Sequence, residues 1–166
     1  MKIFESNCKG FIPIPDTNNF HEQWVAGTYI HTGIFPRFGD QITIDKIQDE
    51  IPALHSLIKQ NRKKKILKGI SASYIIPLYQ ASCFPAEVEE WIKARPQYKY
   101  AIWHEPVLFN DQTNEAIMNQ NWGIFGLSFR DYLAQIICSY LSTISKEFSL
   151  NGNQIKMDPT RGLTLS

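Results

Sequence analysis

The sequence predicts a single domain of the α+β class, with a mixed or mainly antiparallel sheet and about three helices. Runs rich in β-branched and aromatic residues alternate with helical patterns, but without the regular spacing of βαβ repeats. The chain of 166 residues is the size of one domain and can bury a core. No internal repeat or linker-like shift in composition divides it, so residues 1–166 are taken as one domain.

The first part of the chain is expected to contain two strands. Residues 1–20 are expected to be irregular, because prolines and turn-forming residues recur there. A strand follows at 24–31, where β-branched and aromatic residues dominate, and a shorter one at 41–44. The residues predicted to form the turn between these strands are Gly33, Pro36 and Gly39.

A helix is predicted at 45–64, because apolar residues recur there at helical intervals. Asp45 and Gln48 have the spacing of a capping box. Pro52 interrupts the pattern: it either kinks the helix or occupies the first position of a shorter one. The sequence leaves both alternatives open.

The middle of the chain is predicted to alternate between strands and a short helix. Strands are expected at 66–73 and 74–80, with Pro77 indicating an edge position or a bulge. A helix is expected at 85–94, with Pro85 at its first position, and a strand at 98–109, broken by Pro106.

The last third has the clearest patterns. Residues 111–114 supply turn chemistry, and a broad apolar stripe after the cap pair Ser128 and Asp131 predicts the final helix. Asn151–Gly152 is a strong signal for a type I′ hairpin. Residues 158–166 are expected to be frayed.

Composition indicates a globular protein of a reducing compartment. Hydrophobic residues make up 43% of the chain and charged residues 20%, and no apolar run approaches the roughly 20 residues that span a bilayer. Cys8, Cys83 and Cys138 have no CxxC spacing, and no secretory signal is seen. We therefore expect a cytoplasmic location, no membrane association, no metal and no cofactor.

The net charge of +1 hides a basic cluster between Lys59 and Lys68. Lys63, Lys64 and Lys65 form its centre and are candidates for binding an acidic protein surface or, as an alternative, nucleic acid. The plainer interpretation is a solvated helix end, where cations complement the helix dipole.

His104 and Glu105 are the one adjacent pair suited to proton chemistry. Neighbours in a strand point to opposite faces, so this pair is only a weak catalytic candidate. No metal-ligand spacing, phosphate-binding loop or nucleophile motif supports it. The amide-rich connection at 110–121 offers adaptable hydrogen bonds to a partner. Its binding candidates, with the aromatic residue that follows, are Asn114, Asn119, Asn121 and Trp122.

These features favour a non-enzymatic, cytoplasmic protein-binding module. The bacterial proteins that best fit this composition are immunity proteins, which bind and neutralise a cognate toxin, although no motif here identifies such a family. One alternative is a small enzyme that uses His104 and Glu105 with further groups. Another is an accessory protein that binds nucleic acid through the basic cluster.

Overall fold

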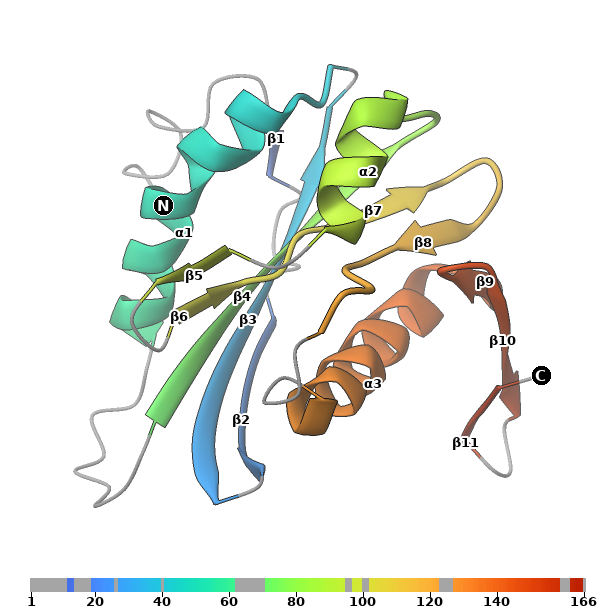
Figure 1. Ribbon diagram of the computed structural model, residues 1–166. Coiled ribbons are helices and arrows are strands. Elements are labelled where there is room, and N and C mark those ends of the chain that lie inside the picture. Colours follow the sequence, from blue (N-terminus) through green and yellow to red (C-terminus); the bar gives the residue numbers. More distant parts are fainter. Residues whose placement is uncertain are drawn as a thin grey trace.

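The computed structural model describes residues 12–13, 19–25, 27–39, 41–61, 71–94, 97–99, 102–122, 127–158 and 162–165. All strands in these ranges belong to one mixed sheet, accompanied by three helices (Figure 1). The predicted α+β class and mixed sheet are confirmed. The helices are α1 (Ile44–Asn61), α2 (Ala86–Lys93) and α3 (Leu127–Ile144).

The two long central strands are β3 (Thr28–Phe38) and β4 (Ser71–Ala81), which are parallel. On its other side β4 pairs in parallel with two short strands in succession, β6 (Ile102–His104) and β7 (Val107–Asn110). The sheet continues from β7 through β8, β9, β10 and β11, while β1 and β2 pair with β3. These remaining strands are β1 (Ile12–Pro13), β2 (Asn19–Val25), β5 (Gln97–Lys99), β8 (Glu115–Ile117), β9 (Glu147–Leu150), β10 (Asn153–Asp158) and β11 (Gly162–Leu165).

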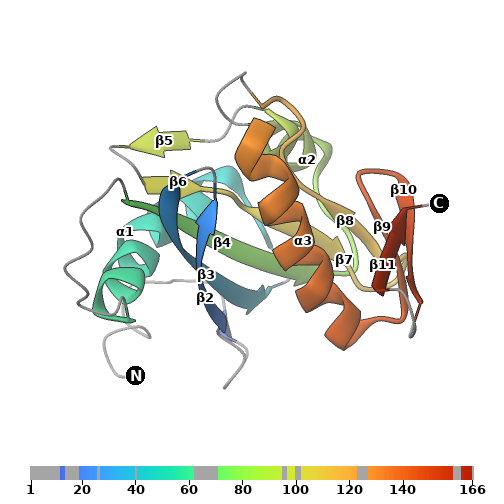
Figure 2. The ribbon, with the colours of Figure 1, turned by 90° about the horizontal axis from the view of Figure 1, so that it is seen from below.

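The helices divide between the two faces of the sheet. Figure 1 shows α1 and α2 in front of the long strands, and their buried residues share a core with Tyr79 of β4. The helix α3 packs on the opposite face, against Tyr74 and Ile76 of the same strand. Seen from below, α1 and α3 flank the central strands (Figure 2). We call these the α1 face and the α3 face.

The start of α1 differs from the prediction. The Thr43 hydroxyl accepts the backbone N–H of Lys46 at 3.3 Å, so Thr43 caps the helix. The expected strand at 41–44 is therefore wrong, and the buried side chain of Ile42 instead packs in the α1–α2 core. Pro52 lies inside α1, which excludes the alternative that it starts a shorter helix.

The predicted strand at 24–31 is a hairpin of β2 and β3, which turns at Gly27 with a φ of 78°. Gly33 and Pro36 lie within β3, so the turn expected there is wrong. A Cβ on Gly33 would come within 2.7 Å of the Phe35 ring, and this close packing explains a glycine inside a strand.

Pro77 lies in a central strand, neither at an edge nor in a bulge. Ile75 is level with His104 and Leu78 is level with Val107, so the same register places Pro77 opposite Pro106. Neither proline has an N–H to donate, and the ladder between β6 and β7 is interrupted there. Because the Glu105 N–H points to β4, the neighbouring Pro106 nitrogen faces away from it, and only the missing donor of Pro77 faces this gap.

The region predicted as one strand at 98–109 folds as a hairpin of β5 and β6 followed by β7. Pro85 is the N-cap of α2, not its first helical residue. Near the end of the chain, the predicted hairpin is confirmed: Asn151 and Gly152 have φ values of 51° and 80° between β9 and β10.

The ends of the chain are more regular than expected. The strands β1 and β2 begin within residues 1–20, and β11 pairs with β10 in the stretch expected to fray. In α3, Ile137 and Cys138 are buried as the apolar stripe predicts. No helix in the described ranges is long and apolar enough to cross a membrane.

Candidate functional site

His104 and Glu105 lie on opposite faces of the sheet. His104 is level with Ile75, which packs against α1. The Glu105 backbone N–H donates to the Ile75 carbonyl at 2.8 Å, so the strand geometry continues through this residue. Alternation therefore directs Glu105 to the α3 face. The two side chains cannot share a substrate or exchange a proton directly.

Glu105 is a buried carboxyl that has no countercharge among the described residues. The residue is 0% exposed, and neither carboxyl oxygen forms a hydrogen bond of normal geometry with any described residue. Burial raises the pKa of Glu105 to about 8, although the backbone and side-chain amides of nearby Asn119 lower it in part. At neutral pH this carboxyl is therefore mainly protonated.

Two buried phenols lie on the same face as Glu105. Burial and the neighbouring Glu105 raise the pKa of Tyr74, with a smaller contribution from Tyr132. Burial raises the pKa of Tyr132, whose hydroxyl lies 3.2 Å from that of Thr32 on β3. Tyr74 also stacks on Trp103, with ring centroids 5.9 Å apart. Glu105 thus belongs to a largely uncharged cluster of polar and aromatic groups.

His104 is also buried, and neither ring nitrogen has a hydrogen-bond partner among the described residues. Burial lowers the pKa of His104 to about 4, so the ring is neutral at physiological pH. A neutral His and a protonated Glu on opposite faces are not the arrangement of a general acid and base that act together.

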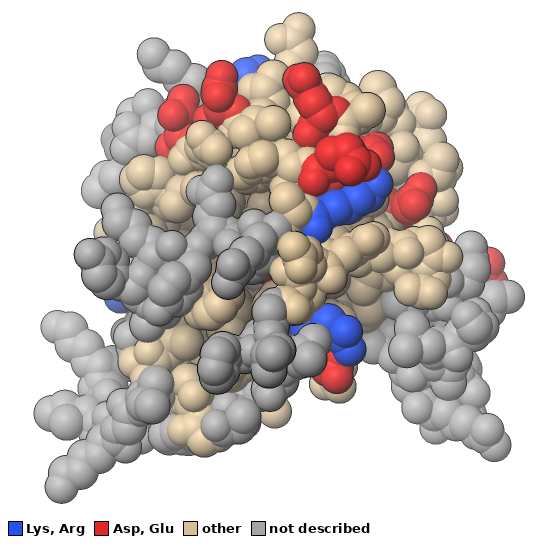
Figure 3. Space-filling view, in the orientation of Figure 1, with Lys and Arg blue, Asp and Glu red and all other residues tan. Residues whose placement is uncertain are grey.

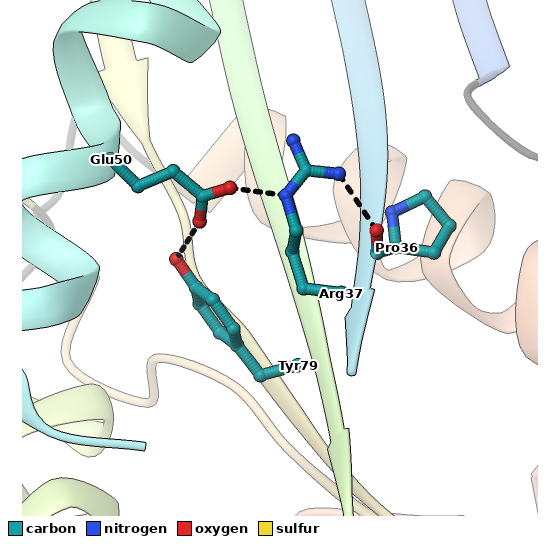
Figure 4. Close-up of polar contacts among 4 residues, drawn as sticks. All are labelled: Pro36, Arg37, Glu50 and Tyr79. Carbon is teal, nitrogen blue, oxygen red and sulfur yellow. Dashed lines mark hydrogen bonds and ion pairs between the residues drawn. The ribbon is translucent and has the colours of Figure 1, made fainter. Parts of the chain in front are cut away.

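A buried charge network that the sequence analysis missed lies on the α1 face (Figure 4). Arg37 of β3 forms an ion pair with Glu50 of α1, and both side chains are 0% exposed. Tyr79 of β4 donates its hydroxyl to the second Glu50 oxygen at 2.8 Å, and the Arg37 guanidinium donates to the Pro36 carbonyl at 2.7 Å. The network joins α1 to both central strands.

The sequence did contain one sign of this network. Glu50 falls between Ile47 and Leu54 on the apolar stripe of α1, where a charge needs a buried partner. Nothing local identifies that partner, because Arg37 lies on another element and was expected in a turn.

The predicted binding residues of the amide-rich connection are not one exposed loop. Asn114 is half-buried in the β7–β8 turn, with a φ of 54°, and Asn121 is exposed. Asn119 is buried, and its side-chain oxygen accepts the Asn121 N–H at 2.9 Å. Trp122 is buried as well and donates its indole N–H to the Asn119 carbonyl at 3.0 Å.

Exposed acidic residues gather over α1, α2 and the β7–β8 turn, in the upper part of Figure 3. In α2, Lys93 forms ion pairs with Glu89 and Glu90 at 3.8 and 3.4 Å, but acidic residues remain in excess there. We call this surface the acidic face. Its residues are the exposed Asp45, Asp49, Glu87, Glu90, Asp111 and Glu115, together with the half-buried Glu89.

The remaining predicted binding residues, Lys63, Lys64 and Lys65, lie outside the described residues. Within the described ranges, no group of three or more His, Cys, Asp or Glu residues could hold a metal ion.

Comparisons with known proteins assign no family. No protein-family model matches the chain, and neither a curated protein nor a solved structure is significantly similar to it. The function of this protein is therefore inferred from its own residues.

Proposed function

We propose that this protein is a non-enzymatic protein-binding module, and that it acts as an inhibitor of the toxin-immunity type. The acidic face is the observation that supports the proposal best. It fits a partner with a basic surface, and opposite charges would speed their encounter. A cytoplasmic location and a bacterial source, both expectations from composition, belong to the same proposal.

The acidic face changes which residues we expect to bind. Asn114 lies in the same turn as Asp111 and next to Glu115 at the start of β8, so it remains a candidate at the edge of this surface. Asn119 and Trp122 are buried, and a partner could reach them only after a rearrangement. Lys63, Lys64 and Lys65 remain candidates for a second, basic contact.

Affinity capture from the source cell, followed by mass spectrometry, tests whether there is one protein partner. Association kinetics then test the surface. Reversing Glu87 and Glu90 to Lys should slow association by about ten-fold at low salt, because it removes attraction over the α2 part of the face. The defect should shrink as salt is raised, since screening acts over about 10 Å at 0.1 M.

A matched control reverses two exposed acidic residues elsewhere, Asp131 of α3 and Glu147 of β9. This variant should associate at nearly the wild-type rate. Equal slowing of both variants would mean that only net charge matters and would remove the acidic face as the interface. The association rate of a variant with Lys63, Lys64 and Lys65 changed to Glu tests in the same way whether the basic cluster contacts the partner.

The enzyme alternative is tested by His104→Ala and Glu105→Gln. If the module only binds, both variants should keep the protein's biological effect within a few-fold, provided that they fold. A folded variant that loses about a hundred-fold or more would favour an enzyme. Co-purification of a nucleic acid, with affinity that falls steeply with salt, would favour the third alternative.

A further inference from the structure

The strand β2 lies at one border of the sheet. It pairs with β3 on one side, and no strand among the described residues pairs with its other side. Figure 1 shows β2 beside β3, on the side away from β4. The register between β2 and β3 runs without a break from Asn19 opposite Ile34 to Val25 opposite Thr28. The outer border of β2 is therefore regular extended backbone without a bulge.

The hairpin register determines which backbone groups of β2 face outward. Val25 and Thr28 flank a two-residue turn, so they form a hydrogen-bonded pair, and such pairs recur at every second residue. The N–H and C=O groups of His21 therefore face β3, whereas those of Phe20 and Glu22 point away from it. Another extended strand carries acceptors and donors at the spacing that matches this outward row.

The strand β2 lacks the features that usually keep a sheet edge from pairing. Proline, lysine and bulges are common protections, and none of them occurs in Asn19–Val25. Glu22 is the only Asp, Glu, Lys or Arg in the strand, and its carboxylate is hydrogen-bonded to Nδ1 of His31 at 2.8 Å. Phe20 packs edge-on against Phe35 but remains 36% exposed. An added strand would therefore cover apolar surface without having to displace a basic side chain.

We propose that β2 pairs with β2 of a second copy of this chain, in antiparallel orientation, so that the two sheets join across a two-fold axis. The side chains of His21 and Gln23 share one face of β2, and a neutral imidazole or an amide offers both a donor and an acceptor. Burial lowers the pKa of His21, which favours the neutral ring. The net charge of +1 leaves little repulsion between two copies. This inference does not depend on the proposed function.

The acidic side chain of β2 restricts the register of the pairing. A register centred on Glu22 would place two carboxylates directly opposite each other, which destabilises a strand pair. A register centred on His21 avoids this contact. It pairs Phe20 of each copy with Glu22 of the other, through the N–H and C=O groups that point away from β3. We therefore expect the register centred on His21.

Sedimentation of the full chain over about 10–500 µM tests the proposal. The wild type should shift from monomer to dimer as its concentration rises. Phe20→Pro removes an N–H that faces outward but no hydrogen bond to β3, so it should weaken dimerisation by about ten-fold or more. Phe20→Leu is the matched control, because it keeps an apolar side chain and the N–H. It should dimerise within a few-fold of the wild type.

Amide hydrogen exchange measured by NMR reports the same pairing without a variant. In the dimer at high concentration, the amides of Phe20, His21 and Gln23 should all be protected. On dilution to the monomer, the Phe20 amide should lose its protection. The His21 and Gln23 amides should keep theirs, because they remain bonded to β3.

Three results would overturn the proposal. The first is a wild type that stays monomeric over the whole concentration range. The second is a dimer that forms equally well in folded Phe20→Pro, which would mean that another surface joins the copies. The third is a Phe20 amide whose protection does not change with concentration. If Phe20→Pro fails to fold, the exchange measurement on the wild type still decides.

Discussion

The two faces of the sheet each bury a glutamate, and they do so in opposite ways. On the α1 face, Glu50 is bonded by Arg37 and Tyr79, so its charge and hydrogen-bonding capacity are matched. On the α3 face, Glu105 has no cation and no hydrogen bond of normal geometry among the described residues. Both residues are almost completely inaccessible to water. Burial alone therefore does not determine what a carboxyl does; its partners do.

This difference separates structural from responsive groups. A matched network resists change, because moving any member leaves another one unpaired. An unmatched carboxyl responds to pH, because only the protonated form suits its site. The comparison can be tested by substituting buried residues on each face and measuring the stability of the variants.

The largest effect should come from the matched network. Arg37→Met leaves Glu50 charged, buried and without its cation, which should lower the free energy of unfolding by about 3–5 kcal/mol. Urea unfolding measures it. Replacing all three members with apolar residues (Arg37→Met, Glu50→Met and Tyr79→Phe) should recover much of the loss. If Arg37→Met alone is as stable as the wild type, the ion pair between Arg37 and Glu50 contributes little to stability.

A somewhat smaller effect is expected in the apolar core of the α3 face. Ile137 is 1% exposed, so Ile137→Ala should cost about 2–4 kcal/mol through lost burial and a cavity. Ile144 lies on the same helix but is 44% exposed, and Ile144→Ala should cost less than about 0.5 kcal/mol. Urea midpoints of both variants test the difference. Equal midpoints would mean that this face is not a tightly packed core.

The effect of pH is the smallest of the three when it is taken per pH unit, and it has opposite signs for the two buried groups. The folded state lowers the pKa of His104 to about 4, so His104 makes stability fall as pH drops from 6.5 towards 4. The folded state raises the pKa of Glu105 to about 8, so Glu105 makes stability fall as pH rises from 4.5 to 8. Each contributes up to about 1.4 kcal/mol per pH unit.

Unfolding midpoints at pH 5, 6.5 and 8 separate the two contributions. Glu105→Gln should remove the loss between pH 6.5 and 8. Between pH 5 and 6.5 the two contributions oppose each other, so His104→Leu should gain stability as pH falls there, and Glu105→Gln should lose it. If the wild type and Glu105→Gln respond equally to pH between 6.5 and 8, Glu105 is not buried as an unpaired acid in solution.

The sequence by itself determined the features that depend on neighbouring residues. The apolar stripe of α3 follows from helical periodicity, the β9–β10 hairpin from Asn151–Gly152, and the opposite faces of His104 and Glu105 from strand alternation. The α+β class follows from the interspersed patterns. Each of these signals lies within a few residues along the chain.

Only the tertiary structure decided the features that depend on distant partners. Local rules favour a turn at Gly33 and an edge position for Pro77, but both residues lie in central strands, where Gly33 packs against Phe35 and Pro77 lies opposite Pro106. Whether Glu50 or Glu105 finds a cation is likewise decided across the sheet, since Arg37 lies on another element. The free energy of a buried charge is set by what surrounds it in space, and one strand or helix does not contain that information.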